Sequence, residues 1–329
     1  MKHSLPTVTR RGVLTLAAAA ALPSAWAQGY PDKPITWVCP YPAGSASDVT
    51  ARQFANEFAK VIKQPVIMMN KVGAGGLVGT KFVAMAPPDG YTLLVGAIGT
   101  HVFNPVINKS TNYDPIKDFE PVSRIVSFPN VLVVSSALGV NTVAEFVAMA
   151  KSRANKPMTY GTAGNGTTSH IAAAQFENLS GAKFLGVNYS GTPAAMTEVL
   201  AGRVDFVFGN INVVLPYVRT GALKALAIAS DKRYALMPTT PTFSEVRMPE
   251  MEMSVWSGLF LPAGTPRAIA AQLNDAVKAV AKTNVLQPIY ESAGATLEVD
   301  NSPEDFARLI QADTKKWVPV VKAMGVQVQ

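Results

Sequence analysis

Two short loops in this sequence combine the residue types that can hold an anion without an ionised side chain. The first, Pro40 to Asp48, reads Pro-Tyr-Pro-Ala-Gly-Ser-Ala-Ser-Asp, and the second, Gly161 to His170, reads Gly-Thr-Ala-Gly-Asn-Gly-Thr-Thr-Ser-His. Each follows an apolar run and leads into a helical pattern, so backbone N–H groups and a helix dipole point at it. Neither loop contains Lys or Arg. We therefore predict reversible capture of an anion by amides, hydroxyl groups and water. Taken alone, the first loop is equally consistent with an ordinary strand-to-helix connection.

Catalysis is a second possibility for the later loop, because Ser169 and His170 are adjacent and Asp205 could complete a triad. However, neighbours in the first turn of a helix point in different directions, and no G-x-S-x-G turn surrounds Ser169. His101 is another candidate base, but no motif connects it to Ser169. The sequence predicts no catalytic residues, and a serine hydrolase remains the less favoured alternative.

Metal and cofactor sites lack the necessary ligands. Cys39 is the single cysteine, and the histidines beyond the N-terminal leader are His101 and His170, all on separate segments without ligand spacing. The glycine-rich run from Gly73 to Gly79 does not match a dinucleotide fingerprint. We expect no metal and no cofactor.

The N-terminus has the three parts of a secretory signal peptide. These are a basic start with Lys2, Arg10 and Arg11, an apolar stretch from Val13 to Leu22, and the site Ala25-Trp26-Ala27. We predict a signal peptide over residues 1–27, cleavage after Ala27 and a periplasmic location. Loss of three basic residues lowers the formal net charge from +7 to +4. This small charge, without basic runs, gives no reason to expect a nucleic-acid partner.

Strand patterns alternate with helical patterns through most of the chain, which predicts an α/β fold with doubly wound, parallel sheets. Two extended segments interrupt this alternation. One comprises the runs 119–126 and 131–134, separated at Phe128-Pro129-Asn130, and the other spans Met253 to Leu261. We interpret them as two crossovers between domains. The predicted division is residues 28–127 and 254–329 for a discontinuous first domain and 128–253 for an inserted second domain, with the ligand between them.

The order of motifs over Tyr30 to Val328 resembles the solute-binding proteins of the tripartite tricarboxylate transporter family, also called Bug receptors. The resemblance rests on the two loops above and on further segments, which are Gly73-Ala74-Gly75-Gly76, Ala86-Pro87-Pro88-Asp89-Gly90-Tyr91-Thr92, Tyr113-Asp114-Pro115-Ile116-Lys117-Asp118-Phe119, Leu200-Ala201-Gly202-Arg203-Val204-Asp205 and Pro262-Ala263-Gly264-Thr265-Pro266. It implies a two-domain periplasmic-binding-protein fold, type II-like, that closes on a small organic carboxylate.

The resemblance also implies the residues that bind the carboxylate and the partners of the protein. The implied ligand-binding residues are Tyr41, Ala43, Gly44, Ser45 and Asp48 in the first loop, Thr162, Gly166, Thr167, Thr168, Ser169 and His170 in the second, and Tyr189 and Asn210 beyond them. The implied function is that of a monomeric, non-enzymatic receptor that delivers its ligand to the membrane components of a tripartite tricarboxylate-type transporter. A ligand-binding input module for a signalling system is the other binding-protein alternative.

Overall fold

The computed structural model describes residues 29–153 and 155–325, so the predicted signal peptide and its cleavage site lie outside the described residues. Within these ranges the chain alternates between strands and helices. The strands are β1 (Ile35–Cys39), β2 (Val66–Asn70), β3 (Thr92–Ala97), β4 (Phe119–Ser135), β5 (Met158–Thr162), β6 (Phe184–Asn188), β7 (Phe206–Asn210), β8 (Leu223–Ile228), β9 (Ser254–Pro262) and β10 (Thr296–Leu297).

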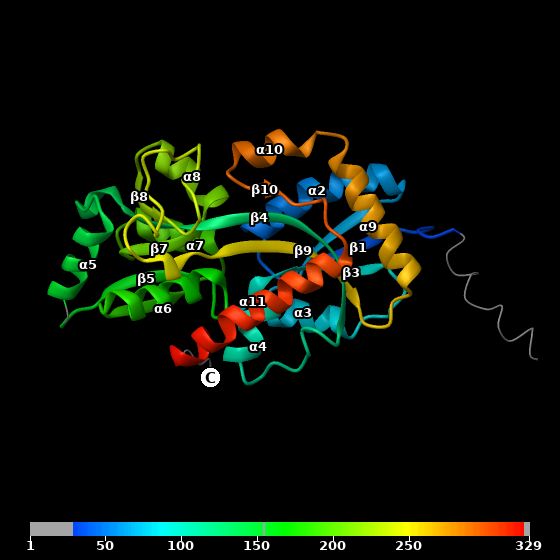
Figure 1. Cartoon of the computed structure of the whole chain (residues 1–329), viewed down its shortest axis with the longest axis horizontal. Helices are drawn as coiled ribbons and strands as arrows, with labels where there is room; N and C mark the ends of the chain where they lie inside the picture. The colour runs from blue at the N-terminus through cyan, green and yellow to red at the C-terminus, as the bar shows by residue number, and fades with distance from the viewer. Residues whose placement is uncertain (1–28, 154, 326–329) are drawn as a thin grey trace, which may run out of the picture.

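The strands form one curled sheet with two halves that share β4 (Figure 1). In the first half, β1 pairs in parallel with β2 and β3, and β9 pairs antiparallel with β3 and with residues 119–129 of β4. In the second half, β5 pairs in parallel with β6 and β7, while β7 and β8 pair antiparallel with residues 130–135 of β4. The predicted α/β fold of the periplasmic-binding-protein type is confirmed.

The predicted break at Phe128-Pro129-Asn130 is wrong, because these residues lie within β4, a single strand of 17 residues. Pro129 forms the last pair with β9, opposite Ser254, and Asn130 forms the first pair with β7, opposite Asn210. Pro has no N–H group and normally interrupts a ladder. Here it occupies the point where β4 changes partner, so the strand continues past it.

Helices cover both faces of the sheet (Figure 1), and their bounds are α2 (Ala46–Ile62), α3 (Leu77–Ala84), α4 (Asn104–Ile107), α5 (Val143–Ser152), α6 (Thr168–Ser180), α7 (Thr192–Leu200), α8 (Ile211–Arg219), α9 (Arg267–Ala281), α10 (Leu286–Ser292) and α11 (Pro303–Ala323). The apolar face of α2 packs on β1, where the Trp37 and Phe58 rings lie 5.2 Å apart between centroids. A capping box formed by Ser302 and Asp305 begins α11. The sequence patterns did not indicate α8 or α10.

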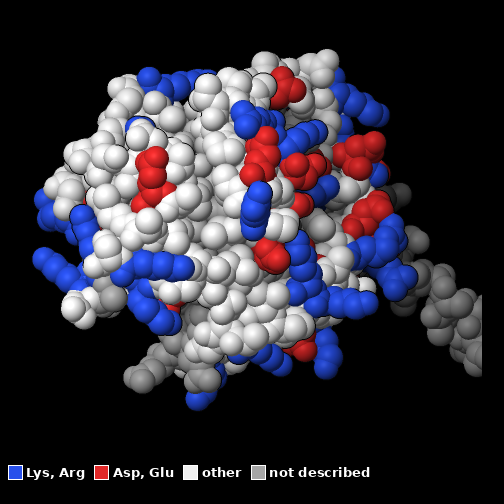
Figure 2. All heavy atoms as spheres, turned by 60° about the vertical axis from the view of Figure 1, so that its left-hand side comes forward, with Lys and Arg blue, Asp and Glu red and all other residues white. Residues whose placement is uncertain are grey.

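Charged side chains are mixed over the surface. On the face shown in Figure 2, basic and acidic side chains lie next to one another at the upper right and uncharged surface separates most of the other basic side chains, so this face has no continuous basic stripe. None of the helices in the described parts of the chain combines the length and the apolar character needed to span a bilayer.

Candidate ligand-binding site

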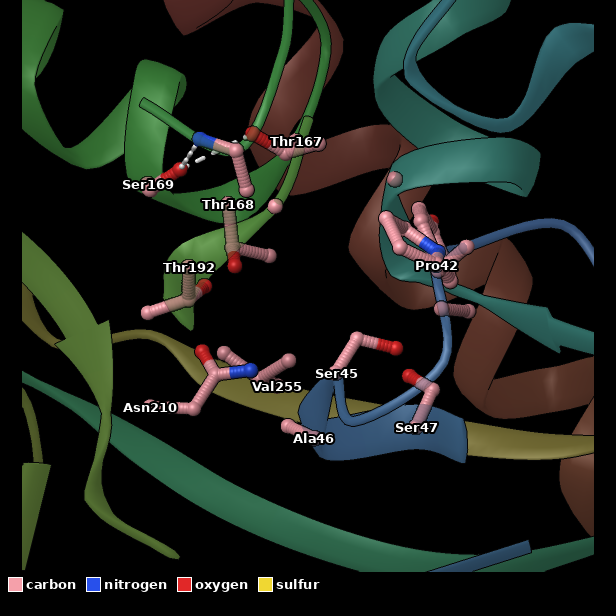
Figure 3. A pocket seen from close by; sticks show the side chains of 15 residues that line it. Pro42, Ser45, Ala46, Ser47, Thr167, Thr168, Ser169, Thr192, Asn210 and Val255 are labelled. Carbon is pink, nitrogen blue, oxygen red and sulfur yellow. Dashed lines mark hydrogen bonds between the residues drawn. The ribbon is translucent and has the colours of Figure 1, made fainter. Parts of the chain in front are cut away.

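A cavity lies between the two halves of the sheet, where the two predicted loops face each other (Figure 3). The cavity has a volume of about 50 Å³ that water molecules can occupy. This is room for roughly three to five waters at about 10–15 Å³ each. Its walls come from the β1–α2 loop, the β5–α6 loop and four other segments, and the lining residues are Tyr41, Pro42, Ser45, Ala46, Ser47, Ala97, Gly99, Ala163, Thr167, Thr168, Ser169, Gly191, Thr192, Asn210 and Val255.

Four helices direct their N-termini at this cavity. The residues at their N-cap positions are Ser45 for α2, Thr167 for α6, Gly191 for α7 and Asn210 for α8, and all four line the cavity. The N–H groups of a first helical turn have no partner within the helix, and each N-terminus carries about half a positive charge. No Lys, Arg, His, Asp or Glu is among the lining residues. The arrangement therefore attracts an anion through backbone dipoles alone.

The carboxylate of Asp48 stabilises the first loop through hydrogen bonds. This carboxylate accepts hydrogen bonds from the Gly44 N–H at 3.0 Å, Arg52 Nε at 3.0 Å and Asn70 Nδ2 at 2.7 Å. Burial raises the pKa of Asp48, but the hydrogen bonds from Arg52, Asn70 and Gly44 outweigh it and hold the pKa below its ordinary value. Ser45 Oγ accepts a hydrogen bond from the Asp48 N–H, whereas the Asp48 carboxylate accepts from the N–H of Gly44 and not from that of Ser45. Asp48 thus shapes the loop and does not line the cavity.

The second loop is shaped by its own hydroxyl groups. Thr162 Oγ1 donates to the Gly164 carbonyl at 2.9 Å and accepts from its N–H at 2.8 Å. Ser169 Oγ accepts from the Ala163 N–H at 3.0 Å and lies 2.9 Å from Thr167 Oγ1 (Figure 3). His170 Nδ1 accepts from the Gly166 N–H at 3.2 Å, and burial lowers the pKa of His170. These bonds fix the loop while Thr168 remains directed into the cavity.

The candidate triad of a serine hydrolase is not assembled. The hydrogen bonds of Ser169 go to its own loop, and Asp205 Oδ2 is bonded to the N–H and the hydroxyl group of Thr159. His101 lies elsewhere, stacked on Phe260 with 3.8 Å between ring centroids. Burial lowers the pKa of His101 to about 3, so this imidazole is neutral in its core position.

The structure places the predicted site residues in two groups. Those that line the cavity are Tyr41, Ser45, Thr167, Thr168, Ser169 and Asn210. Those outside its lining are Ala43, Gly44, Asp48, Thr162, Gly166, His170 and Tyr189. Ala43 and Gly44 are exposed at the tip of their loop, and Tyr189 faces a neighbouring cavity that shares Tyr41 with this one. The outer group shapes or flanks the loops.

Several lining residues were not predicted. Ala97 is the last residue of β3 and Gly99 follows that strand, Val255 lies at the start of β9, and Gly191 and Thr192 are the N-cap and first residue of α7. The dipeptide Thr192-Pro193 marks a helix start, because Pro is favoured in the first turn. No local pattern marks Ala97 or Val255, which reach the cavity only because β3 and β9 are neighbours in the sheet.

The two halves of the sheet touch through glycines around the cavity. A Cβ atom on Gly75 would lie 1.8 Å from the carbonyl oxygen of Asn165, and one on Gly166 would lie 2.0 Å from Asn104 Oδ1. Gly191 is less crowded, since a Cβ atom there would lie 3.1 Å from Pro42 Cγ. The backbone of each half thus approaches the other more closely than any side chain would permit, and the cavity is closed.

A family model identifies the family of this chain. The model described as the tripartite tricarboxylate transporter family receptor matches residues 50–326. The chain belongs to this family. Protein BugT of Bordetella pertussis is 30% identical, over 97% of this chain and 97% of its own length. This receptor is therefore a periplasmic solute-binding protein, as the motifs indicated, and the hydrolase alternative is wrong.

Solved structures of similar receptors agree with the fold. MatC of Rhodopseudomonas palustris, which has bound malate, is 32% identical, with a TM-score of 0.85 over 89% of this chain and 100% of that chain. A second protein of R. palustris, solved with adipate, is 30% identical, with a TM-score of 0.86 over 90% of this chain and 98% of its own.

Proposed function

We propose that this receptor captures a small organic acid through its carboxylate in the cavity between the two sheet halves. The observation that carries this proposal is the convergence of four helix N-termini on a cavity whose lining has no Lys, Arg, His, Asp or Glu. Unpaired N–H groups and hydroxyls hold a carboxylate well, and release requires no ion pair to be broken. Malate and adipate, bound by two similar proteins, are both small carboxylates and support this ligand class.

We further propose that capture and release occur by movement of two domains, residues 28–127 with 254–329 against residues 128–253. Two strands, β4 and β9, run between the halves of the sheet (Figure 1), and the boundary at 127/128 lies within β4. Bending at two extended strands would separate the glycine contacts and open the cavity. The family supports delivery of the ligand to the membrane components of a tripartite tricarboxylate-type transporter.

Calorimetry of the mature receptor against di- and tricarboxylates, aromatic acids and acidic amino acids tests the capture. We expect saturable binding of at least one acid and no binding of its methyl ester, because esterification removes the negative charge. Absence of binding across the panel would refute the proposal.

Cells that lack the receptor should lose uptake of the bound acid, and unchanged uptake would contradict the transport role.

The role of the helix N-termini can be tested with Thr168→Pro. Thr168 is the first residue of α6, and the preceding Thr167 has φ −77° and ψ 162°, a conformation compatible with a following Pro. Pro at this position preserves the helix but removes one N–H group. We expect the affinity for the carboxylate to fall roughly 10-fold and the melting temperature to stay near that of the wild type.

Thr168→Val is the matched control, because it removes the hydroxyl group and keeps the N–H group. Its affinity should be clearly higher than that of Thr168→Pro in the same calorimetric titration. Equal affinities in the two variants would show that the backbone donor is not used.

A further inference from the structure

Asn130 has an unusual environment for a buried polar residue. It lies in β4 with 0% of its surface exposed, and neither Nδ2 nor Oδ1 of its side chain has a hydrogen-bond partner. Buried side-chain amides in proteins are normally paired, and leaving both atoms unpaired is unfavourable. A hydrophobic side chain would fill this position at no such cost. The unpaired amide therefore points to a partner that the protein alone does not supply.

The place of Asn130 in the sheet indicates where that partner would bind. Asn130 is paired directly with Asn210 across the antiparallel ladder of β4 and β7. Directly opposed residues point to the same face of a sheet, with Cβ atoms about 4.5–5.5 Å apart. Asn210 lines the cavity, and although it is the N-cap residue of α8, its side chain makes no capping bond (Figure 3). Asn210 thus lies in the cavity lining, and Asn130, its direct neighbour in the ladder, is fully buried next to it.

We propose that Asn130 and Asn210 together bind the second polar group of a ligand that carries one at each end. This inference rests on the proposed function, in which the first carboxylate is held by the helix N-termini that converge on the cavity. Each carboxamide offers N–H donors and a carbonyl acceptor, so the pair accepts a second carboxylate, a carboxamide or a hydroxyl group. Neighbouring residues cover Asn130 completely when the cleft is closed. The second polar group of the ligand therefore reaches Asn130 before the cleft closes.

This pair of amides gives the receptor a means of selection. A ligand with a polar second end satisfies atoms that are otherwise unpaired in the closed protein. A ligand of the same length with a methyl end leaves these carboxamide atoms without a hydrogen-bond partner and without access to water. Sites of this kind reject such analogues strongly. Asn130 is accordingly assigned as a specificity residue, whereas the four helix N-termini supply the general attraction for an anion.

The experiment compares the wild type with Asn130→Leu, which has a similar volume and no polar atoms. Calorimetry uses succinate and adipate as two-ended probes, with butyrate and hexanoate as their one-ended counterparts. For the dicarboxylates that the wild type binds, we expect Asn130→Leu to weaken binding roughly 10- to 100-fold. The affinity for the monocarboxylates should rise rather than fall, because the variant no longer leaves a buried amide unpaired beside a methyl end, and the ligand-free melting temperature should not fall.

Gln175→Leu is the matched control, because Gln175 is also buried in the second half with an unpaired Oε1 atom and does not line the cavity. It should leave the affinities for both classes of probe unchanged. Equal losses for the one-ended and two-ended probes in Asn130→Leu, or no loss at all, would overturn the assignment. If Asn130→Leu does not fold, Asn130→Ser is titrated with the same probes and the same outcomes decide. Failure of the wild type to bind any carboxylate would instead refute the proposed function.

Discussion

Replacement of Gly75 by Ala is expected to weaken ligand binding by at least about 100-fold. The added Cβ would lie 1.8 Å from the carbonyl oxygen of Asn165 in the opposite half, and a backbone atom cannot rotate away as a side chain can. Gly75 also has φ +64°, which disfavours a side chain even in the open protein. The variant should therefore fold but fail to close, so that the ligand contacts one half only. Calorimetry measures the affinity, and small-angle X-ray scattering measures the compaction on ligand addition.

The control separates backbone strain from loss of closure. Gly139 has φ +77°, and a Cβ atom added to it would have no other atom within 4 Å, so Gly139→Ala carries similar strain far from the cleft. Both variants should lose a similar amount of unfolding free energy, about 1 kcal/mol, and Gly139→Ala should bind ligand as the wild type does. Ligand-induced compaction of Gly75→Ala with wild-type affinity would show that closure does not need this contact.

The second large effect concerns Asp48, where Asp48→Asn should lower the free energy of unfolding by about 2–3 kcal/mol at pH 7. The Asp48 side chain is 3% exposed and accepts hydrogen bonds from three donors. The N–H groups of an asparagine amide at this position would face these donors and could not accept hydrogen bonds from them. The partly exposed Arg52 keeps the effect below that of a fully buried ion pair. Because Gly44 and Ser45 would shift, ligand affinity should fall as well. Urea denaturation measures the stability.

The pH dependence of Asp48→Asn provides an independent check. The pKa of Asp48 is lower in the folded protein than its ordinary value, so the unfolded chain binds more protons in acid. The stabilisation by Asp48 is complete above about pH 4 and is lost as the pH falls through the folded pKa. The difference between wild type and variant should therefore be constant at neutral pH and shrink progressively as the pH falls below about 4. Asp231→Asn, at an exposed carboxylate, is the control. A difference that stays constant as the pH falls below about 4 would contradict the assigned role of Asp48.

The local parts of this fold can be predicted from the sequence because they depend on neighbours in the chain. The buried face of α2, the hydroxyl cap of Ser45 and the capping box of α11 are formed by residues within one or two helical turns. The role of Asp48 was harder to predict, since its partner Asn70 is 22 residues away and reaches it only because β1 and β2 are paired.

The sequence by itself determined that two uncharged loops open two helices and that the motifs match a family of receptors. Only the tertiary structure decided that four helix N-termini meet, that Gly75 touches Asn165, and that Asn130 lies beside Asn210. A helix end is set by interactions between residues about four positions apart. The convergence of several ends depends on the order of strands in the sheet, which brings together residues separated by 80 positions, as with Asn130 and Asn210.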